Sequence, residues 1–403
     1  MIENALILAA GKGTRMWPLT ENSPKPLLPL GGLPIIERQI QEFKKVGVKN
    51  LYILIGYQMK ELSDYLDETI FDININYIVQ EMQNGTGHAV NQAKGIIQGN
   101  FYCINGDLIV DSKNLERLKE KKNNLTMMVT RVKDGANFGV VDSMNGRLVS
   151  IKEKSIRGES SINAGIFLFN ERIFEAIDNI EKSIRGEFEL TDALQNISNE
   201  IHILEYQGFW KDIGAPWDLI TANEEYMRNL ENQIKGNIED NVVIKGNIHL
   251  EEGSIIKSGT YIEGPVWIGK DCTVGPNSYL REGTVLCGKN KVGAATEIKN
   301  SILMRNAKAP HHNYVGDSII GENSNLGSGT KIANLRLDKK RIKVVHKGVK
   351  RNTERRKLGA IIGNNVNTGI NASINVGTIL GNNIKIGPNS LVSGTYESQS
   401  TII

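Results

Sequence analysis

The fold of this chain is decided by the stretch "IIKSGTYIEGPVWIGKDCTVGPNSYLREGTVL", residues 255–286. An aliphatic residue recurs there at every sixth position, at Ile256, Ile262, Ile268, Val274, Leu280 and Leu286. An α-helix repeats every 3.6 residues and cannot produce this spacing. A coil with three short faces, each pointing one large aliphatic residue inward, does produce it. The pattern therefore predicts stacked coils.

The period of six continues on both sides of this stretch. It begins at Ile238 and runs to Met304, and it resumes over 320–332 and over 362–392. Gly, Asn, Pro and Ser cluster between the aliphatic positions, as turns require. The pattern resembles the hexapeptide signature of left-handed parallel β-helices, and we expect residues 237–403 to form one.

The period is interrupted twice. The first interruption contains "KAPHHNYVGD", residues 308–317, and we expect this segment to loop out of the coils. The second, residues 334–359, is strongly basic. It is either a solvated loop, a nucleic-acid patch without the interleaved aromatic residues such patches use, or a grip on an anionic cofactor or sugar phosphate. The last is the simplest. Loops that leave a rigid scaffold are where sites are built.

The first part of the chain follows another pattern, in which apolar strand-like runs alternate with amphipathic helix-like runs. This alternation predicts an α/β, Rossmann-like domain with a mostly parallel sheet and helices on both faces. Ligands bind such sheets at the carboxyl ends of the strands. We expect this domain to span 1–227, a linker to span 228–236, and the β-helix to follow over 237–403.

Composition excludes several classes of protein. The net charge of +3 is too small to indicate a nucleic-acid or membrane partner. Cys103, Cys272 and Cys287 are far apart and lack CxxC spacing, so we expect no zinc site or disulfide framework and a reducing cytoplasm. The N-terminal apolar run is too short for a signal peptide and reads as a buried strand.

A longer motif follows the first strand, "LAAGKGTRMWPLTENSPKPLLPLGG", residues 8–32. Gly11 and Gly13 let backbone N–H groups approach a polyphosphate, and Arg15 adds a charged donor. The motif resembles the signature of sugar-1-phosphate nucleotidyltransferases, a resemblance that also implies a role for Lys25 on the phosphates.

Other positions match this family in chain order. The resemblance implies that nucleotide and sugar are bound by Ala10, Gly11, Gly13, Gln80, Gly85, Thr86, Gly139, Glu153 and Asn163. It implies Asp107 and Asp212 as ligands of Mg²⁺, which prefers carboxylate oxygens. Asparagine is usual at the second position in acetylglucosamine uridyltransferases, whereas aspartate is common in thymidylyl and mannosyl branches. Taken singly, Asp107 reads equally as a helix cap, Lys25 as a surface lysine and Asp212 as a turn residue.

The form "GTGHA", residues 85–89, looks most like the uridyltransferases. It favours UTP as the nucleotide, with dTTP as the alternative. His88 reads as a helix-start residue.

Across nearly its whole length the chain resembles bifunctional N-acetylglucosamine-1-phosphate uridyltransferase/glucosamine-1-phosphate acetyltransferases of the archaeal form. The resemblance implies acetyl-CoA as co-substrate and a homotrimer with sites between subunits. It implies His311 as the general base for the acceptor amine, a role that imidazole suits because it titrates near neutral pH. His312 reads as a surface residue. The implied acceptor and acetyl-CoA contacts are Arg281, Lys299, Tyr314, Asn325, Ser328, Asn334 and Lys340.

Two alternatives remain open. One is a mannose- or glucose-1-phosphate nucleotidyltransferase whose β-helix is only structural. The other is a non-catalytic subunit like those of the translation-initiation nucleotide-exchange factor. Such subunits tend to lose the signature Arg, Lys or metal aspartates, and all four residues are present here.

Overall fold

The computed structural model describes residues 2–121, 125–153, 158–346 and 348–403. The chain forms two compact units. The first unit consists of Met1–Lys12, Pro24–Leu27 and Ile35–Asp212, and the second of Gly13–Ser23, Leu28–Pro34 and Ile213–Ile403. The division does not follow the boundary expected at residue 227, because the last helix before that boundary clusters with the C-terminal coils.

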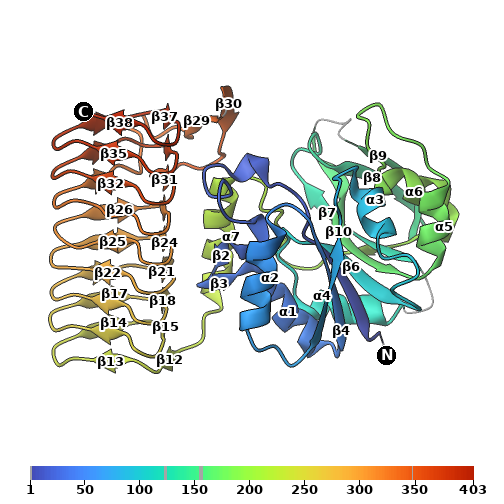
Figure 1. The fold of residues 1–403 in the computed structure, drawn as a ribbon, viewed down its shortest axis with the longest axis horizontal. Coiled ribbons are helices and arrows are strands. Elements are labelled where there is room, and N and C mark those ends of the chain that lie inside the picture. Colours follow the sequence, from blue (N-terminus) through green and yellow to red (C-terminus); the bar gives the residue numbers. More distant parts are fainter. Residues whose placement is uncertain (1, 122–124, 154–157, 347) are drawn as a thin grey trace. The chain divides into compact units, whose positions relative to one another are not determined.

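The first unit is built on a nine-stranded sheet in the order β5-β4-β1-β6-β10-β7-β11-β9-β8 (Figure 1). The first four strands in this order run parallel: β5 (Asn74–Val79), β4 (Asn50–Ile55), β1 (Asn4–Leu8) and β6 (Phe101–Asn105). Beyond them the sheet is mixed. β10 (Ser160–Phe169) runs antiparallel to both of its neighbours, β6 and β7 (Thr126–Val132). β11 (His202–Glu205), β9 (Arg147–Glu153) and β8 (Gly139–Met144) complete it. The sheet is therefore less parallel than the alternation of runs predicts.

Helices cover both faces of this sheet, as expected. One core cluster holds side chains of α1 (Ile35–Lys45), α2 (Met59–Glu68) and α4 (Ser112–Lys119). The other holds side chains of α3 (Thr86–Asn91), α5 (Arg172–Asp178) and α6 (Leu190–Asn196). In α1, Ile36, Ile40 and Phe43 are fully buried, and their spacing of three and four residues places them on one face.

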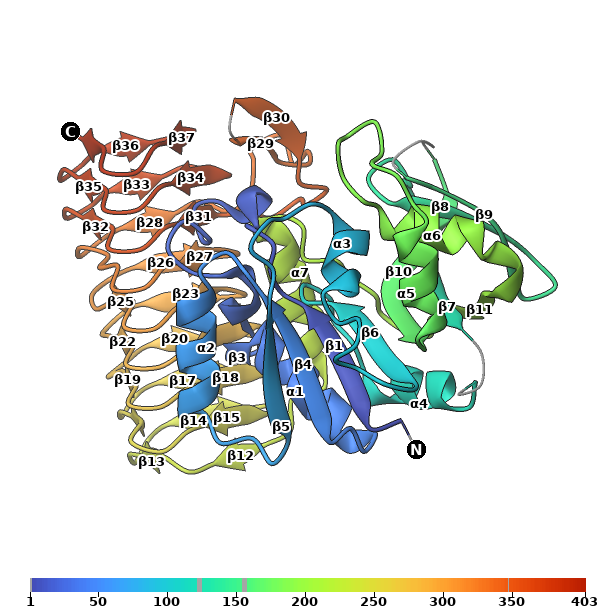
Figure 2. The same ribbon diagram turned by 45° about the vertical axis from the view of Figure 1, so that its right-hand side comes forward.

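The second unit contains a helix and a stack of parallel coils (Figure 2). Helix α7 (Pro216–Arg228) starts with proline at its first turn, where no backbone donor is lost. A short hairpin of β2 (Pro29–Leu30) and β3 (Leu33–Pro34) contacts α7.

The coils present three ladders. The first ladder is β12 (Gln233–Ile234), β15 (Ile248–Leu250), β18 (Val266–Ile268), β21 (Thr284–Leu286), β24 (Ile302–Leu303), β27 (Ile319–Ile320), β31 (Ala360–Ile362), β34 (Thr378–Leu380) and β37 (Thr395–Tyr396). The second is β13 (Asn237–Ile238), β16 (Ile255–Ile256), β19 (Thr273–Val274), β22 (Lys291–Val292) and β25 (Lys308–Ala309), continued by β32 (Asn367–Thr368), β35 (Lys385–Ile386) and β38 (Thr401–Ile402). The third is β14 (Val243–Lys245), β17 (Tyr261–Glu263), β20 (Tyr279–Leu280), β23 (Glu297–Lys299), β26 (Tyr314–Gly316), β28 (Lys331–Ile332), β33 (Ser373–Ile374) and β36 (Leu391–Val392).

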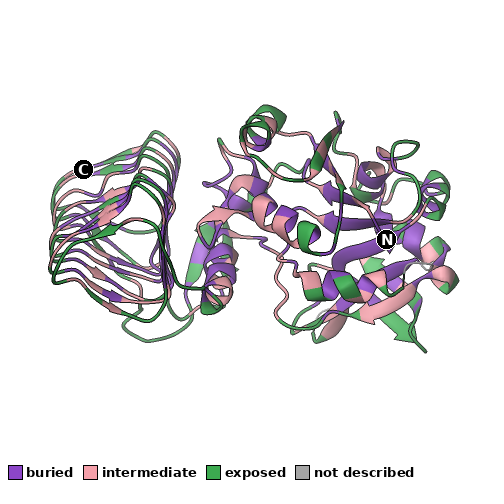
Figure 3. Ribbon diagram, turned by 90° about the horizontal axis from the view of Figure 1, so that it is seen from below, coloured by how far each residue is buried: buried purple, intermediate pink, exposed green. Residues whose placement is uncertain are grey.

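The aliphatic residues of the period form one continuous buried cluster inside the coils. This is the β-helix that the hexapeptide pattern predicts. Figure 3 looks along the stack of coils and colours their ribbon by burial. Strand β12 lies within the stretch expected to be a linker and pairs with β15, so the coils begin there.

The expectation that residues 305–319 loop out of the coils is wrong. The segment carries β25 and β26, and it points Ala309 and Val315 into the core. The phase of the period shifts because one corner, between the third ladder and the first, is short. From Leu280 to Leu286 the inward step is six residues, but from Ile298 to Leu303 and from Val315 to Ile320 it is five. Leu303 therefore replaces the expected Met304 as the inward residue.

Buried serines close the two short corners. The hydroxyl of Ser301 donates to the carbonyl of Lys299 and accepts from the backbone N–H of Ser318. Ser318 repeats the arrangement one coil later, with Gly316 and Ala360 as partners. These side-chain bonds satisfy backbone groups that a shorter turn leaves unpaired.

At the same corner, one coil further, the chain leaves the ladder altogether. Residues 334–359, here called the basic strap, run between β28 and β31 and form a hairpin of β29 (Lys343–His346) and β30 (Val349–Asn352). Among the helices of the described residues, none is both long and apolar enough to cross a bilayer.

Candidate active sites

In the first unit, the parallel strands end at one edge with the expected nucleotide-binding residues. Ala10 and Gly11 follow β1, and Gln80 follows β5. A Cβ added at Gly56, which follows β4, would lie 3.0 Å from both the Cβ of Ala10 and the carbonyl oxygen of Gln80. The strand ends are therefore closely packed there, while Gly11 faces open space.

The two expected metal carboxylates come together at the same sheet. Asp107 follows β6, and its neighbour Leu108 forms an isolated β-bridge with Asp212. The ammonium of Lys25 donates to Oδ2 of Asp107 at 2.5 Å, and this lysine is only 8% exposed. The arrangement joins a buried cation to the first carboxylate and places the second one residue away across the bridge. Two neighbouring carboxylates are hard oxygen ligands of the type that suits Mg²⁺, which keeps water and phosphate in its other positions.

The expected base-reading segment is held rigidly. Gly85 has a φ of +107°, and a Cβ there would lie 2.5 Å from the carbonyl oxygen of Phe188, so only glycine fits. The Thr86 hydroxyl accepts from the backbone N–H of Leu190 at 3.0 Å. The imidazole of His88 lies 2.9 Å from the amide nitrogen of Gln80, an arrangement that orients this glutamine.

The expected sugar contacts also meet. Gly139 at the start of β8 pairs directly with Glu153 at the end of β9. Asn163 lies beside Ile162, which pairs with Val140, and its side-chain oxygen accepts from the N–H of Gly165. The three residues thus surround one spot of the mixed half of the sheet.

Sequence reasoning missed two neighbours of this spot. Thr191 is 4% exposed, its methyl group would lie 3.4 Å from a Cβ at Gly139, and its hydroxyl has no partner among the described residues. Arg185 bonds Glu189 at 2.6 Å and approaches Glu153 to 4.0 Å. A buried, unused hydroxyl and a carboxylate are the groups that a sugar hydroxyl satisfies.

In the second unit, residues 13–23 form a compact turn. Gly13 has a φ of +59° and precedes a 3₁₀ turn over Thr14–Met16. The hydroxyl of Thr20 donates to the carbonyl of Gly13 at 2.9 Å. Arg15 is exposed at the tip of the turn, where its guanidinium is available to an anion.

The third ladder stacks the expected acceptor residues. Arg281 and Lys299 occupy corresponding positions on successive coils, and Gly316 follows on the next. In the column beside them, Tyr314 lies between Glu297 and Lys331. Adjacent strands are about 4.8 Å apart, so this face gathers two cations and a phenol within the span of a small sugar phosphate.

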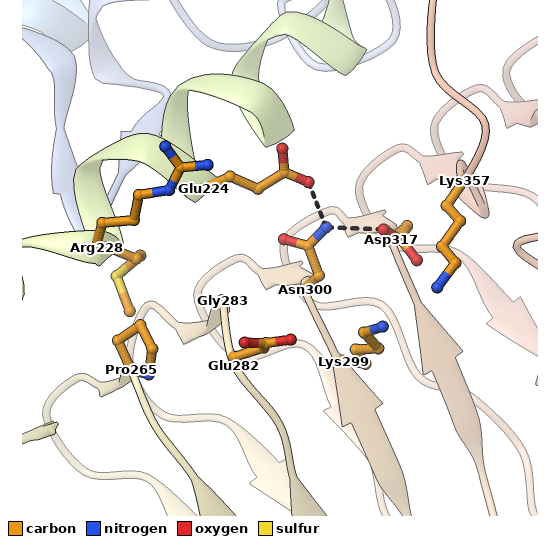
Figure 4. Close-up of a pocket in the computed structure, with 10 residues that line it drawn as sticks. Glu224, Arg228, Pro265, Glu282, Gly283, Lys299, Asn300, Asp317 and Lys357 are labelled. Carbon is orange, nitrogen blue, oxygen red and sulfur yellow. Dashed lines mark hydrogen bonds between the residues drawn. The ribbon is translucent and has the colours of Figure 1, made fainter. Parts of the chain in front are cut away.

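A cavity of about 500 Å³ opens at the short corner next to this face (Figure 4). The cavity is lined from three successive corners by Glu282, Asn300 and Asp317. Its other charged lining residues are Lys299, Arg228 of α7 and Lys357 of the basic strap. The side chain of Lys357 is within hydrogen-bonding reach of Lys299. Burial and this second positive charge lower the pKa of Lys299.

A buried polar network holds the cavity in shape. The carboxylate of Asp317 is 3% exposed and accepts from the amides of Asn300 at 2.7 Å and Asn334 at 2.6 Å. The side chains of Asn334 and Tyr314 both lie close to Gly316, and the pKa of Tyr314 is raised by burial and then by Glu297. Tyr314 therefore stays protonated and remains a donor at neutral pH.

The remaining expected residues lie at the opposite corner and in the strap. His311 is exposed at the corner before β26, and its imidazole makes no hydrogen bond within the described residues. Its carbonyl accepts from the N–H of Gly329, which follows Ser328 on the next coil. Asn325 is on the second ladder, bridged to Lys308 and Asn367.

Lys340 is not brought to these residues. It is exposed in the strap, where its backbone N–H bonds Asp338. The lysine that the strap delivers to the cavity is Lys357, which sequence analysis did not single out. The only feature of the sequence that pointed to Lys357 was its position in the basic run over residues 334–359.

Comparisons with known protein families match three regions of the chain. Residues 4–229 match the family described as nucleotidyl transferase, residues 262–356 a GMPPB C-terminal domain, and residues 359–393 a hexapeptide repeat of succinyl-transferase.

Two relatives match over nearly the full length. A bifunctional protein GlmU of Methanococcus vannielii is 42% identical, over 99% of this chain and 97% of its own. A bifunctional sugar-1-phosphate nucleotidylyltransferase/acetyltransferase of Sulfurisphaera tokodaii is 42% identical, over 96% of this chain and 97% of its own.

Among solved structures, a putative glucose-1-phosphate thymidylyltransferase of Bacillus anthracis is 26% identical, with a TM-score of 0.51, over 58% of this chain and 98% of its own. The full-length matches include both the nucleotidyl transferase region and the hexapeptide coils. The chain belongs to the family of bifunctional GlmU proteins.

Proposed function

We propose that this protein N-acetylates glucosamine-1-phosphate with acetyl-CoA and then transfers a uridylyl group from UTP to the N-acetylglucosamine-1-phosphate formed. The observation that carries the proposal is the 42% identity to a bifunctional protein GlmU over 99% of this chain. Both halves also retain residues of the type that each reaction needs.

In the acetyl transfer, the acceptor amine attacks the thioester carbonyl and must lose a proton. The imidazole of His311 is exposed and accepts it, and the thiolate of CoA leaves. Arg281, Lys299 and Lys357 offset the charge of the acceptor phosphate. Tyr314 and Asn334 donate hydrogen bonds to the sugar from positions that Asp317 fixes.

In the uridylyl transfer, an oxygen of the sugar phosphate attacks the α-phosphorus of UTP and pyrophosphate leaves. Catalysis of this kind is alignment and neutralisation of charge. Asp107 and Asp212 would hold Mg²⁺, which when bound neutralises phosphate charge and aligns the triphosphate. Lys25 and Arg15 contribute positive charge on the nucleotide, and Gly139, Glu153 and Asn163 hold the sugar.

We further infer a homotrimer in the cytoplasm. Three thiols, Cys103, Cys272 and Cys287, are free, which fits a reducing compartment. One face of the coils carries the acceptor residues on an open ladder, and a neighbouring subunit would enclose it.

A second candidate differs in substrates. Asp212 is the residue common in thymidylyl branches, and a thymidylyltransferase structure aligns with 58% of the chain. This candidate uses dTTP, or a hexose-1-phosphate other than N-acetylglucosamine-1-phosphate.

One panel separates these candidates. Pyrophosphate release is measured for UTP, dTTP and GTP against a set of sugar-1-phosphates, and thiol release from acetyl-CoA is measured with glucosamine-1-phosphate. We expect UTP with N-acetylglucosamine-1-phosphate to be the best pair and thiol release to be rapid.

Matched variants test the residue assignments in the same panel. Asp107→Asn should lower pyrophosphate release at least ~100-fold and leave thiol release intact, because it removes a charge that aligns phosphates. His311→Ala should lower thiol release ~100-fold, a typical contribution of a general base, and leave pyrophosphate release intact. Thiol release undiminished in His311→Ala, or pyrophosphate release undiminished in Asp107→Asn, would refute the corresponding assignment.

A further inference from the structure

The turn over Gly13–Ser23 belongs to the same compact unit as the β-helix. This turn carries Arg15, to which the proposed function gives a role on the triphosphate. Within the unit, the coils and the basic strap hold the turn at two points.

The first point is His346, the last residue of β29. Its side chain is buried, with only 1% of the residue exposed, and its Nε2 lies 3.1 Å from the carbonyl oxygen of Trp17. A carbonyl can only accept, so this nitrogen carries the proton and donates it. The imidazole also lies between two indoles, with ring centroids 6.0 Å from Trp17 and 6.5 Å from Trp217 of α7.

The second point is Glu21, at the other end of the turn. Its carboxylate accepts from the hydroxyl of Ser398 at 2.6 Å and from the amide of Asn382 at 3.1 Å. Both donors belong to the last coils of the β-helix. Arg15 therefore lies two residues before Trp17, which His346 holds, and six residues before Glu21, which the last coils hold.

We propose that His346 is a positioning residue for uridylyl transfer, which it serves through Trp17 by holding the turn that presents Arg15 to the nucleotide. A turn flanked by glycine at residue 13 would otherwise have many backbone conformations, and nucleotide binding would have to order it. Fixing the turn in advance removes that cost.

This inference rests on the proposed role of Arg15, and the test keeps the two separable. The full-length protein is compared with His346→Ala and His346→Gln, the latter because a glutamine amide can donate to the same carbonyl. His249→Ala is the matched control, since His249 is also a buried histidine of the coils, 9% exposed, but stacks on Trp267 and bonds Glu251. UTP turnover, acetyl transfer and the unfolding midpoint are measured on the same preparations.

We expect His346→Ala to raise the KM for UTP ~10-fold, with kcat changed less. Acetyl transfer should stay within about 2-fold of wild type. His346→Gln should recover most of the UTP affinity, and His249→Ala should keep it whatever its stability.

A His346→Ala protein with the wild-type KM for UTP would overturn the proposal, as would equal losses in both activities. If that variant does not fold, Glu21→Gln supplies the second route, with the same expected rise in KM for UTP and the same contrary result. A wild-type protein that releases no pyrophosphate from any nucleotide would instead overturn the proposed function.

Discussion

Lys299 and Lys357 are the two lysines proposed to bind the phosphate of the acceptor, and they line the same cavity. In the absence of an anion the two ammonium groups repel each other, and both lie at the mouth of a cavity that Asp317 and Glu224 also line. The network of Asn300 and Arg355 occupies these carboxylates, so they do not pair with the lysines. We propose that a phosphate of the acceptor binds there, because its negative charge would offset this repulsion.

The pair predicts a pH dependence for the acceptor. The pKa of Lys299 lies below its ordinary 10.5, because burial disfavours the charged form and Lys357 adds to the effect. Below this lowered pKa Lys299 is charged and can bind the acceptor phosphate, and above it that charge is lost. We expect the KM for glucosamine-1-phosphate to rise as pH passes the pKa of Lys299.

Replacing the neighbour should move this transition. In Lys357→Met the pKa of Lys299 rises toward its ordinary value, so the increase in KM should begin at a higher pH, although the acceptor binds more weakly at neutral pH. Acetyl transfer rates at several acceptor concentrations between about pH 7 and 10 measure both effects. The same onset in both proteins would show that the two lysines do not share one anion.

The lowered pKa of Lys299 also predicts how the free energy of unfolding changes with pH. Between the lowered pKa and 10.5, Lys299 binds fewer protons in the folded than in the unfolded chain. The free energy of unfolding therefore increases with pH across that window, as far as this group contributes.

At the scale of single residues, some residues of the candidate sites could be predicted from the sequence and others could not. Asp107 and Gly139 could be named from the sequence because the motifs around them resemble those of sugar-1-phosphate nucleotidyltransferases, and their roles remain predictions. Lys357 was not, since it is one of many basic residues in a run without periodicity. Thr191 was missed because an ordinary helix start hides a buried hydroxyl.

At the scale of elements, the basic strap is held at its base by Arg355. The guanidinium donates to both oxygens of Glu224, at 2.5 and 3.2 Å, and to the hydroxyl of Thr221 at 2.8 Å. It also approaches Asp317 to 3.6 Å. Although burial raises the pKa of Glu224, its bonds with Arg355 lower it on balance, so the pair is ionised.

Removing this anchor should loosen the strap. Arg355→Met removes two hydrogen bonds to the carboxylate of Glu224 and a positive charge beside the buried carboxylate of Asp317, and we expect a loss of about 1–3 kcal/mol in the free energy of unfolding. The KM for glucosamine-1-phosphate should rise several-fold, because Lys357 lies two residues from the anchor. Denaturant unfolding and acetyl transfer kinetics measure the two effects.

Arg355→Lys is the matched variant. It keeps the charge but not the fork that meets two carboxylate oxygens, so it should restore only part of both losses. A methionine variant with the stability and acceptor KM of the wild type would mean that the strap is fixed elsewhere.

The inward positions of the coils from Ile244 to Ile298 were predictable from the period, but β12, β25 and β26 were not. Hydrophobic period six identifies inward positions as long as every corner has the same length. It fails at Leu303, where Met304 was expected, because a missing corner residue cannot be seen among neighbouring apolar residues such as Ile302, Leu303 and Met304. The compensating serines give no periodic signal.

At the scale of the whole molecule, the residues proposed for uridylyl transfer come from both compact units, whereas those proposed for acetyl transfer come from the second unit alone. Residues 13–23 cluster with the β-helix, whereas Lys25, Asp107 and Asp212 are in the first unit. The boundary expected at residue 227 followed the change of sequence pattern, and a short turn near the N-terminus carries no sign of which core it joins.

This difference between the two reactions should be measurable as a difference in their thermal inactivation. Leu380→Ala opens a cavity in the β-helix core, where Leu380 is fully buried, at a cost of about 2–5 kcal/mol. We expect it to lower the inactivation temperature of both reactions. Leu168→Ala in the first unit, where Leu168 is 1% exposed, should lower that of uridylyl transfer alone. Residual activities after timed heating separate the variants, and a Leu380→Ala protein that loses only acetyl transfer would contradict the shared dependence.

The short corner has a consequence for anyone who redesigns this solenoid. Two consecutive turns lack one residue there, and the third departs into the strap, so Asn300, Asp317 and Lys357 face one another only because the repeat is broken three times in a column. A consensus sequence that restored the missing residues would give a more regular and more easily built rod. It would also separate these three side chains, so that the improved scaffold would no longer grip a phosphate.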